Sequence, residues 1–216
     1  MQRVIAQRMA ATTATVPDFQ VQAEVAIDAL LALRSQLRDV TQRPPSVNDF
    51  IVKAAALALR AFPLVNGSYR DGRLQLHSAV NVGVAVALDG GLIVPTVTDA
   101  DTRSLGSIAA EVRRLADAAR DGTITPADLS GATFTVSNLG MYGMTAITPV
   151  INAPQAAILG AGASHPVLAR AGGEIVDRQV MTLTMSCDHR ILYGAEAARF
   201  LSRVRELLEQ PLALAL

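Results

Sequence analysis

A histidine near the end of the chain stands where a strand is expected to end and a helix to begin. His189 follows an apolar run, and Gly194 precedes the next helical pattern. Junctions of this kind often expose functional side chains. A neutral imidazole there can act as a general base near pH 7. The alternative is a histidine that only ends a strand and hydrogen bonds to Asp188 or Arg190, and position alone favours this alternative.

A second candidate group lies where a predicted strand runs into a loop punctuated by glycines, at residues 135–143. Ser137 supplies a hydroxyl there and Asn138 an amide. Such a loop can place a hydrogen-bond donor on a developing oxyanion. The alternative is a turn in which both side chains satisfy backbone groups, which is the commoner arrangement. The chain has no Gly-x-Ser-x-Gly pattern, so we do not expect a nucleophilic serine on a strand-to-helix elbow.

The other potentially reactive side chains favour structural roles. The three histidines never fall at the spacing of metal ligands, and Cys187 is the single cysteine, so we expect no metal site and no disulfide within the chain. His77 and His165 are interpreted as structural. Cys187 is interpreted as a small buried apolar residue.

Composition excludes several classes of partner. The chain has 19 Lys and Arg against 19 Asp and Glu, and its net charge of zero argues against binding to nucleic acid or to an anionic membrane. No apolar run approaches the ~18 residues of a membrane-spanning helix. One cysteine suits a reducing cytoplasm. Half of the 216 residues are hydrophobic and 18% are charged, which indicates that some apolar surface is buried in an assembly.

The elements that must position these groups alternate along the chain without a linker, and they predict one domain over residues 1–216. Helices are predicted at residues 1–14, from Asp28 as N-cap, from Ser46 to Phe62 with Asp49 completing a capping box, from Ser104 to Arg120, briefly after Pro126, and at Ala195–Glu209. Strands are predicted at Phe19–Ala26, Val80–Leu88, Leu92–Val97, Thr133–Val136, Ala156–Leu159, Val167–Ala171 and Val180–Ser186, with a hairpin at Tyr69–Leu76. This order predicts an α/β fold of the two-layer α+β type, with helices packed on a mixed, largely antiparallel sheet.

Six blocks of the sequence, in order and spread over essentially the whole chain, resemble the catalytic core domain of 2-oxo acid dehydrogenase dihydrolipoamide acyltransferases. They are VIAQRMAATTATVPDFQ, PSVNDFIVKAAALALRAFPLVNGSY, VNVGVAVALDGGLIVPTVTDAD, LSGATFTVSNLGMYG, PVINAPQAAILGAG and CDHRILYG. That family shares its fold with chloramphenicol acetyltransferase, so the resemblance implies this fold.

The resemblance also implies roles for the residues already singled out. His189 matches the family's general base, which deprotonates the thiol of coenzyme A or of dihydrolipoamide, and Ser137 matches the donor to the oxyanion. The separation of 52 residues suits that pair. Asp188, Arg190 and Asn138 are expected to support them. Coenzyme A is then a co-substrate, and the lipoyl group is carried on a separate domain.

One position departs from the family pattern. Tyr193 stands where the family usually has Asp before the signature glycine. In the related chloramphenicol acetyltransferase this Asp pairs with an arginine near the N-terminus, for which Arg8 is the candidate here. We expect Tyr193 to hydrogen bond or to stack on that arginine.

The resemblance implies a homotrimer in which the histidine and serine of neighbouring subunits meet, and trimers that build a cubic or icosahedral core. The apolar end, from Pro211 to Leu216, is expected to dock on a neighbouring trimer. The lipoyl domain and the peripheral-subunit-binding domain are absent from the chain. Through them the longer protein would hold the 2-oxo acid decarboxylase and dihydrolipoamide dehydrogenase.

The residues leave three functions open. The first is an acyltransferase, most simply an acetyltransferase of the cytoplasmic pyruvate dehydrogenase complex. The second is a catalytically idle scaffold core, with Tyr193 marking lost activity. The third is a stand-alone, coenzyme A-dependent acetyltransferase of a small hydroxylated molecule.

Overall fold

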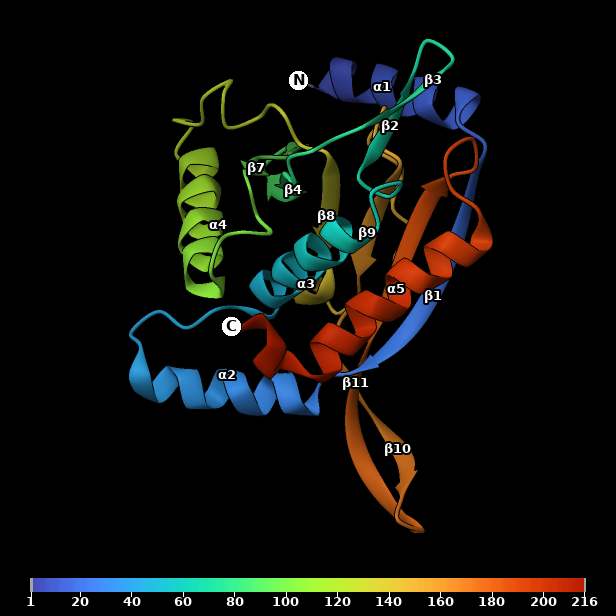
Figure 1. Cartoon of the computed structure of the whole chain (residues 1–216). Coiled ribbons are helices and arrows are strands. Elements are labelled where there is room, and N and C mark those ends of the chain that lie inside the picture. The colour runs from blue at the N-terminus through green and yellow to red at the C-terminus, as the bar shows by residue number, and fades with distance from the viewer. Residues whose placement is uncertain (1, 216) are drawn as a thin grey trace.

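The computed structural model describes residues 2–215, which form helices around one main sheet (Figure 1). The α-helices are α1 (Gln2–Thr15), α2 (Asp28–Val40), α3 (Val47–Ala61), α4 (Leu105–Arg120) and α5 (Gly194–Glu209), with short 3₁₀ turns η1 (Gly140–Tyr142) and η2 (Pro211–Leu214). The strands are β1 (Asp18–Ala26), β2 (Gly67–Arg70), β3 (Arg73–Leu76), β4 (Val82–Val84), β5 (Val86–Leu88), β6 (Gly91–Ile93), β7 (Thr96–Val97), β8 (Phe134–Asn138), β9 (Ala157–Ala161), β10 (His165–Ala171) and β11 (Glu174–Asp188).

The main sheet is mixed, as the sequence predicts. Its order is β1-β11-β9-β8-β4-β7, and β10 pairs with the first half of β11. Strand β8 runs parallel to β4 and β9, whereas the pairs of β11 with β1, β9 and β10 and the pair of β4 with β7 are antiparallel. Strands β2 and β3 form a separate hairpin, as do β5 and β6. The β10–β11 hairpin extends away from the body of the molecule (Figure 1).

Helices α3 and α5 cover one face of the sheet (Figure 1), and the apolar core lies beneath them. Phe200 of α5 packs on Phe134 of β8 with 5.7 Å between ring centroids. Helix α3 begins with the predicted capping box, in which Asp49 N donates to Ser46 Oγ and Ser46 N to Asp49 Oδ2. Burial raises the pKa of Asp49, an effect that its hydrogen bonds to Ser46 oppose. Local chemistry and burial together fix the start of this helix.

The other face of the sheet is covered by the segment that follows β8. At Gly162 a Cβ would overlap the carbonyl of Thr145, and at Gly160 it would overlap the side chain of Ile147. A small cluster of Val16, Ile151 and Ile158 is buried on its own, apart from the main core. The absence of a side chain at the two glycines therefore lets the segment lie directly on β9.

Four predicted elements differ in the structure. The predicted strand Leu92–Val97 divides into β6, which pairs with β5, and β7, which pairs with β4. Asp28 is the first residue of α2 and not its N-cap, because its Oδ1 accepts from Gln179 N and ties the helix to β11. The apolar run predicted as Val80–Leu88 divides at Ala85, since β4 joins the main sheet while β5 turns away to pair with β6. After Pro126 the chain makes turns and no helix. No helix among the described residues is long and apolar enough to cross a membrane.

Candidate active site

His189 lies directly after β11, at the point where that strand meets the start of β1. Its backbone N donates to Pro17 O at 2.8 Å, which fixes the turn against the chain entering β1. The exposed imidazole lies between two aromatic rings, with centroid distances of 4.5 Å to Phe19 and 5.3 Å to Tyr193. None of the described side chains hydrogen bonds to it. A nitrogen of this ring is therefore free to accept a proton from a substrate.

Asp188 and Arg190 bond to each other and leave the imidazole between them unpaired. Arg190 Nε lies 2.9 Å from Asp188 Oδ1 and Arg190 Nη2 lies 2.7 Å from Oδ2. Asp188 is buried, and its hydrogen bonds raise the pKa of the Arg190 guanidinium. Arg190 Cζ also lies 4.4 Å from the centre of the Tyr69 ring. Position alone favours a histidine that hydrogen bonds to Asp188 or Arg190, and the structure does not have this arrangement. Asp188 and Arg190 instead stabilise the turn on which His189 lies.

Ser137 lies on β8, paired with Gly160 of β9, and its side chain is half-buried. No hydrogen bond joins its hydroxyl to another described residue. Asn138 is used differently, because its Oδ1 accepts from Gly140 N at 2.8 Å and its Nδ2 donates to Asn48 Oδ1 at 3.3 Å. The amide therefore builds the turn after β8, while the serine hydroxyl remains available as a donor.

The structure does not bring His189 and Ser137 together within one chain. Through β9, Ser137 lies level with Thr184 of β11, two strands away, and His189 follows Thr184 by five residues. With about 4.8 Å between strands and about 3.3 Å per residue, the two Cα atoms are roughly 19 Å apart. A group bound at His189 is therefore out of reach of the Ser137 hydroxyl of the same chain.

Tyr193 precedes α5, and its ring contacts His189 edge to face at an interplanar angle of 77°. The side chain of Arg8, the predicted partner of Tyr193, lies outside the described residues. The stacking of Tyr193 on Arg8 therefore stays a prediction. Among the described residues, Arg190 stacks on Tyr69.

Sequence reasoning missed two residues of this site, Phe19 and Tyr69. Both reach the end of β11 through pairings distant in sequence: Phe19 lies opposite Cys187, and Tyr69 N donates to Pro154 O. Cys187 itself is buried, and burial raises the pKa of its thiol to about 12, in agreement with a structural role. His77 contacts Ser68 Oγ through Nε2 at 3.1 Å, also as a structural residue.

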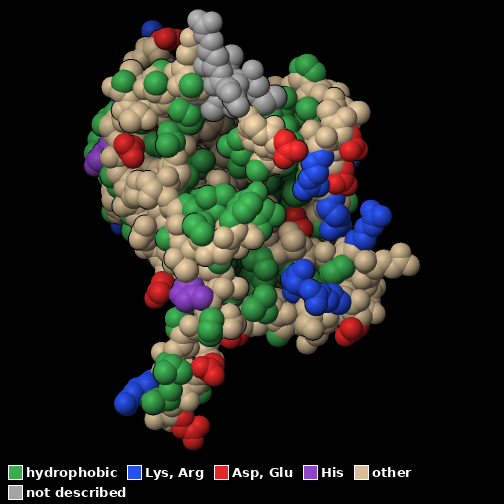
Figure 2. Space-filling model, turned by 180° about the vertical axis from the view of Figure 1, so that it is seen from behind, with side chains coloured by type: hydrophobic (Ala, Val, Ile, Leu, Met, Phe, Trp, Pro, Cys, Tyr) green, Lys and Arg blue, Asp and Glu red, His purple; other side chains and the backbone are tan. Residues whose placement is uncertain are grey.

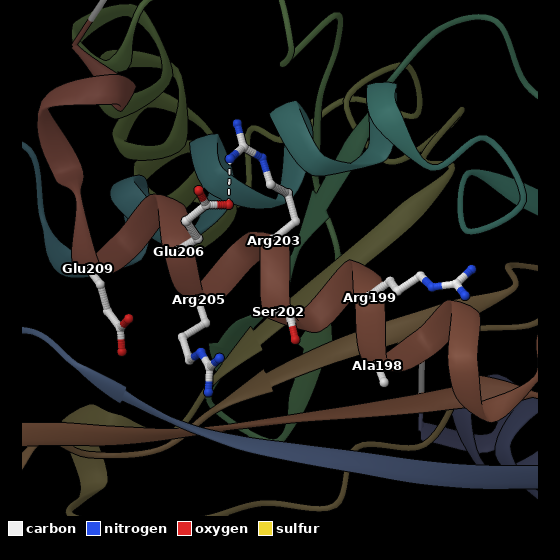
Figure 3. A pocket seen from close by; sticks show the side chains of 7 residues that line it. All are labelled: Ala198, Arg199, Ser202, Arg203, Arg205, Glu206 and Glu209. Atoms are coloured by element: carbon white, nitrogen blue, oxygen red, sulfur yellow. Dashed lines mark hydrogen bonds and ion pairs between the residues drawn. The ribbon is translucent and has the colours of Figure 1, made fainter.

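Two grooves lie away from these residues. One of about 530 Å³ runs along the exposed side of α5 (Figure 3), where Arg203 pairs with Glu206 at 2.6 Å and Arg199 and Arg205 also point outward. A second, of about 560 Å³, lies between α2 and the C-terminal turn η2. Neither is lined by His189 or Ser137. Within the described part of the chain, no group of three or more His, Cys, Asp or Glu residues is arranged to hold a metal ion.

The model of the 2-oxoacid dehydrogenases acyltransferase family (catalytic domain) matches residues 1–216. The chain belongs to this acyltransferase family. The predicted family is therefore confirmed. The chain is 39% identical over 217 residues to the dihydrolipoyllysine-residue acetyltransferase component of the pyruvate dehydrogenase complex of Zymomonas mobilis, covering 99% of this chain and 49% of that protein. It thus spans about half the length of this curated relative.

Solved structures of the acyltransferase family are similar throughout. The dihydrolipoamide acetyltransferase of Azotobacter vinelandii, studied for the role of a serine, a histidine and an asparagine in its catalytic mechanism, matches with 33% identity and a TM-score of 0.95 over 100% of this chain and 90% of that one. The cubic core of a pyruvate dehydrogenase multienzyme complex matches with the same values. Chloramphenicol acetyltransferase, at 16% identity and a TM-score of 0.61 over 94% of each chain, confirms the predicted fold.

Proposed function

We propose that this domain transfers an acetyl group between dihydrolipoamide and coenzyme A in a pyruvate dehydrogenase complex. The observation that carries the proposal is the separation of Ser137 and His189 along the sequence. In the Azotobacter vinelandii acetyltransferase the histidine studied for its catalytic role follows the serine by 52 residues, which is the separation in this chain. The curated relatives from Zymomonas mobilis and Arabidopsis thaliana are components of the pyruvate dehydrogenase complex, which favours this function over a stand-alone acetyltransferase.

The chemistry needs a base and an oxyanion donor. A thiol has a pKa near 8.5 and needs only a modest base, so the imidazole of His189 takes its proton as the thiol attacks the thioester carbonyl. The carbonyl oxygen then carries the negative charge, which the Ser137 hydroxyl stabilises by about 3 kcal/mol. Collapse of the tetrahedral intermediate expels the second thiolate, which recovers the proton from the imidazolium. No covalent bond to the protein forms during these reaction steps.

Each active site is shared between two copies of the chain. The separation of roughly 19 Å within one chain, from the strand spacing, supports this arrangement. A ring of three copies with head-to-tail contacts would bring His189 of one copy to Ser137 of the next at three equivalent sites. Apolar side chains gather over the middle of the face behind the sheet (Figure 2), and the loop after β8 exposes Met141, Tyr142 and Met144. Burial of such surface favours this association.

The apolar end predicted to dock on a neighbouring trimer runs from Pro211 to Leu216, and Leu216 lies outside the described residues. Pro211 and Leu214 are buried in their own chain, so they are not available for docking. Leu212 is 69% exposed beside the groove formed by α2 and the C-terminal turn. We propose that Leu212 and this groove form the contact that joins trimers into a cubic core.

The partners follow from the same proposal. Coenzyme A is the co-substrate, and the lipoyl group arrives on a separate domain. Residues 1–216 form the catalytic core domain of a longer cytoplasmic protein, since the curated bacterial relative is about twice as long. Other domains of that protein hold the 2-oxo acid decarboxylase and dihydrolipoamide dehydrogenase.

The deciding experiment measures transfer from acetyl-coenzyme A to free dihydrolipoamide by the wild-type chain and by His189→Ala. Loss of a general base lowers kcat by at least about 10²-fold. The competing function is an idle scaffold, and Tyr193 is the residue that favours it. In the Azotobacter relative an asparagine studied for its catalytic role lies four residues after the histidine, and this chain has Tyr193 at that spacing. A well-assembled wild-type particle without any transfer would establish the scaffold and overturn our proposal.

A further inference from the structure

The imidazole of His189 is flanked by two aromatic side chains from different elements. Phe19 near the start of β1 lies 4.5 Å away, centroid to centroid, at an interplanar angle of 50°. Tyr193, just before α5, lies 5.3 Å away at 77°. Both distances lie in the range of favourable aromatic pairs. We name Phe19 and Tyr193 the aromatic clamp.

Each ring of the clamp is held by its own backbone. Phe19 is paired opposite Cys187, two residues before His189, in the β1–β11 ladder. Tyr193 is the N-cap residue of α5, where its carbonyl accepts from Ala197 N at 3.1 Å. A strand fixes the backbone of Phe19 and a helix terminus fixes that of Tyr193. The two rings are therefore positioned independently of the His189 imidazole.

The tyrosine hydroxyl does not contribute to this contact. No described residue accepts or donates a hydrogen bond at that hydroxyl, and the side chain is 60% exposed. Arg190 is not held by Tyr193 either, because its guanidinium is bonded to Asp188 and stacked on Tyr69. Among the described residues, the contact that Tyr193 makes to the catalytic machinery is that of its ring with His189.

We propose that Phe19 and Tyr193 are positioning residues that hold the imidazole of His189 in its proton-accepting orientation, and that Tyr193 does so through its ring and not through its hydroxyl. This inference rests on the proposed acyl transfer. An exposed histidine without hydrogen bonds samples several rotamers, and only those that aim a nitrogen at the thiol are productive. In the Azotobacter relative an asparagine lies four residues after the histidine, and in this chain Tyr193 lies four residues after His189, so an aromatic ring stands at the spacing of that amide.

The test compares Tyr193→Ala and Tyr193→Phe in the assembled protein, with kcat and the KM for coenzyme A measured separately. Misplacement of a catalytic group lowers kcat, so we expect Tyr193→Ala to lose about tenfold in kcat with KM changed by less than about twofold. Tyr193→Phe should keep kcat within about twofold, because the ring remains. If Tyr193→Ala keeps the wild-type kcat, or if Tyr193→Phe is as impaired as Tyr193→Ala, the ring does not position the histidine and the proposal is wrong.

Phe19→Ala tests the second ring, and Phe62→Ala is its matched control. Phe62 pairs with Phe200 at 6.0 Å, away from His189, so its removal costs an aromatic contact without touching the site. We expect both variants to lower the Tm and only Phe19→Ala to lower kcat, and an equal kcat in the two would overturn the clamp. Inactive wild-type protein would refute the acyl transfer itself. Active wild type, inactive His189→Ala and unimpaired clamp variants would refute the clamp alone.

Discussion

Asp188 and Arg190, the two neighbours of His189 in sequence, form an ion pair. Arg190 Nε lies 2.9 Å from Asp188 Oδ1, and Arg190 Nη2 lies 2.7 Å from Asp188 Oδ2. The backbone N of Arg190 donates to the same carboxylate at 3.0 Å. These hydrogen bonds stabilise the turn after β11. They join the residues on either side of His189 and do not involve its side chain. The turn thus fixes the backbone of His189, while the aromatic clamp orients its ring.

Asp188→Asn should loosen this turn. The carboxylate is 1% exposed, and its loss leaves the Arg190 guanidinium without its counter-charge at the edge of the core. We expect a loss of about 2 kcal/mol in the free energy of unfolding, less than for a fully buried pair because Arg190 is partly exposed, together with a lower kcat. Urea unfolding and the transfer assay measure the two effects. Asp117→Asn, which breaks the exposed pair with Arg120, should change neither by much, and equal effects of the two variants would contradict our view of the turn.

Acid should remove the stabilisation contributed by Asp128. Hydrogen bonds from Arg114 and Thr125 lower the pKa of its carboxyl to about 2. Because the folded pKa lies below the unfolded one, the stabilisation is fully present above about pH 4 and is lost as the pH falls towards 2. The difference in unfolding free energy between wild type and Asp128→Asn should shrink over that interval, and about 1 M salt should reduce it at neutral pH. A difference that is independent of pH would show that the charge of Asp128 does not act in this way.

Gly162→Ala should disturb the loop that follows Ser137. A Cβ at this position would overlap the carbonyl of Thr145, so the segment lying on β9 must move. We expect a loss of about 2 kcal/mol or more in the free energy of unfolding, and a lower kcat. Gly106→Ala in α4 is the matched control, because nothing lies within 4 Å of its Cβ and helix propensity favours alanine by up to about 1 kcal/mol. Similar stability of the two variants would contradict the close approach.

Patterns that act over a few residues could be predicted from the sequence. The Ser46–Asp49 capping box and the turn at Asp71–Gly72 are of this kind, because each depends on neighbours within the same segment. Motifs also single out His189 and Ser137. His189 follows a strand, as predicted, whereas Ser137 lies within β8 and not in the loop after it.

Features that depend on register or on distant segments could not be predicted. The contact of Phe19 with His189 exists because β1 pairs with β11 in one particular register. The apolar run from Val80 divides because β4 and β5 have different partners, which a hydrophobic pattern does not reveal. The C-terminal run looks uniformly apolar, yet Leu214 packs into the core of its own chain and Leu212 does not.

Leu212→Asp should split the core into smaller particles. The side chain is 69% exposed within its own chain, so a carboxylate there leaves folding intact but cannot be buried against a neighbouring copy. We expect the mass measured by light scattering to fall from that of the large core to that of the trimer, with acetyl transfer to free dihydrolipoamide retained. Leu129→Asp, at an exposed turn after Pro126, is the control that should leave the particle intact. An unchanged core in Leu212→Asp would mean that trimers join elsewhere.

Co-expression of Ser137→Ala and His189→Ala chains should restore activity that neither variant has alone. If every site takes its histidine from one copy and its serine from the next, random mixing in equal amounts completes about one quarter of the sites. The transfer rate should then approach about a quarter of the wild-type rate, whereas sites formed within single chains would give only the average of the two impaired parents. The double variant co-expressed with wild type is the control for assembly, because there too only sites between two wild-type copies are complete. We expect co-expression to restore activity because His189 and Ser137 lie roughly 19 Å apart in one chain. If activity is not restored, the two residues must instead come together within one subunit.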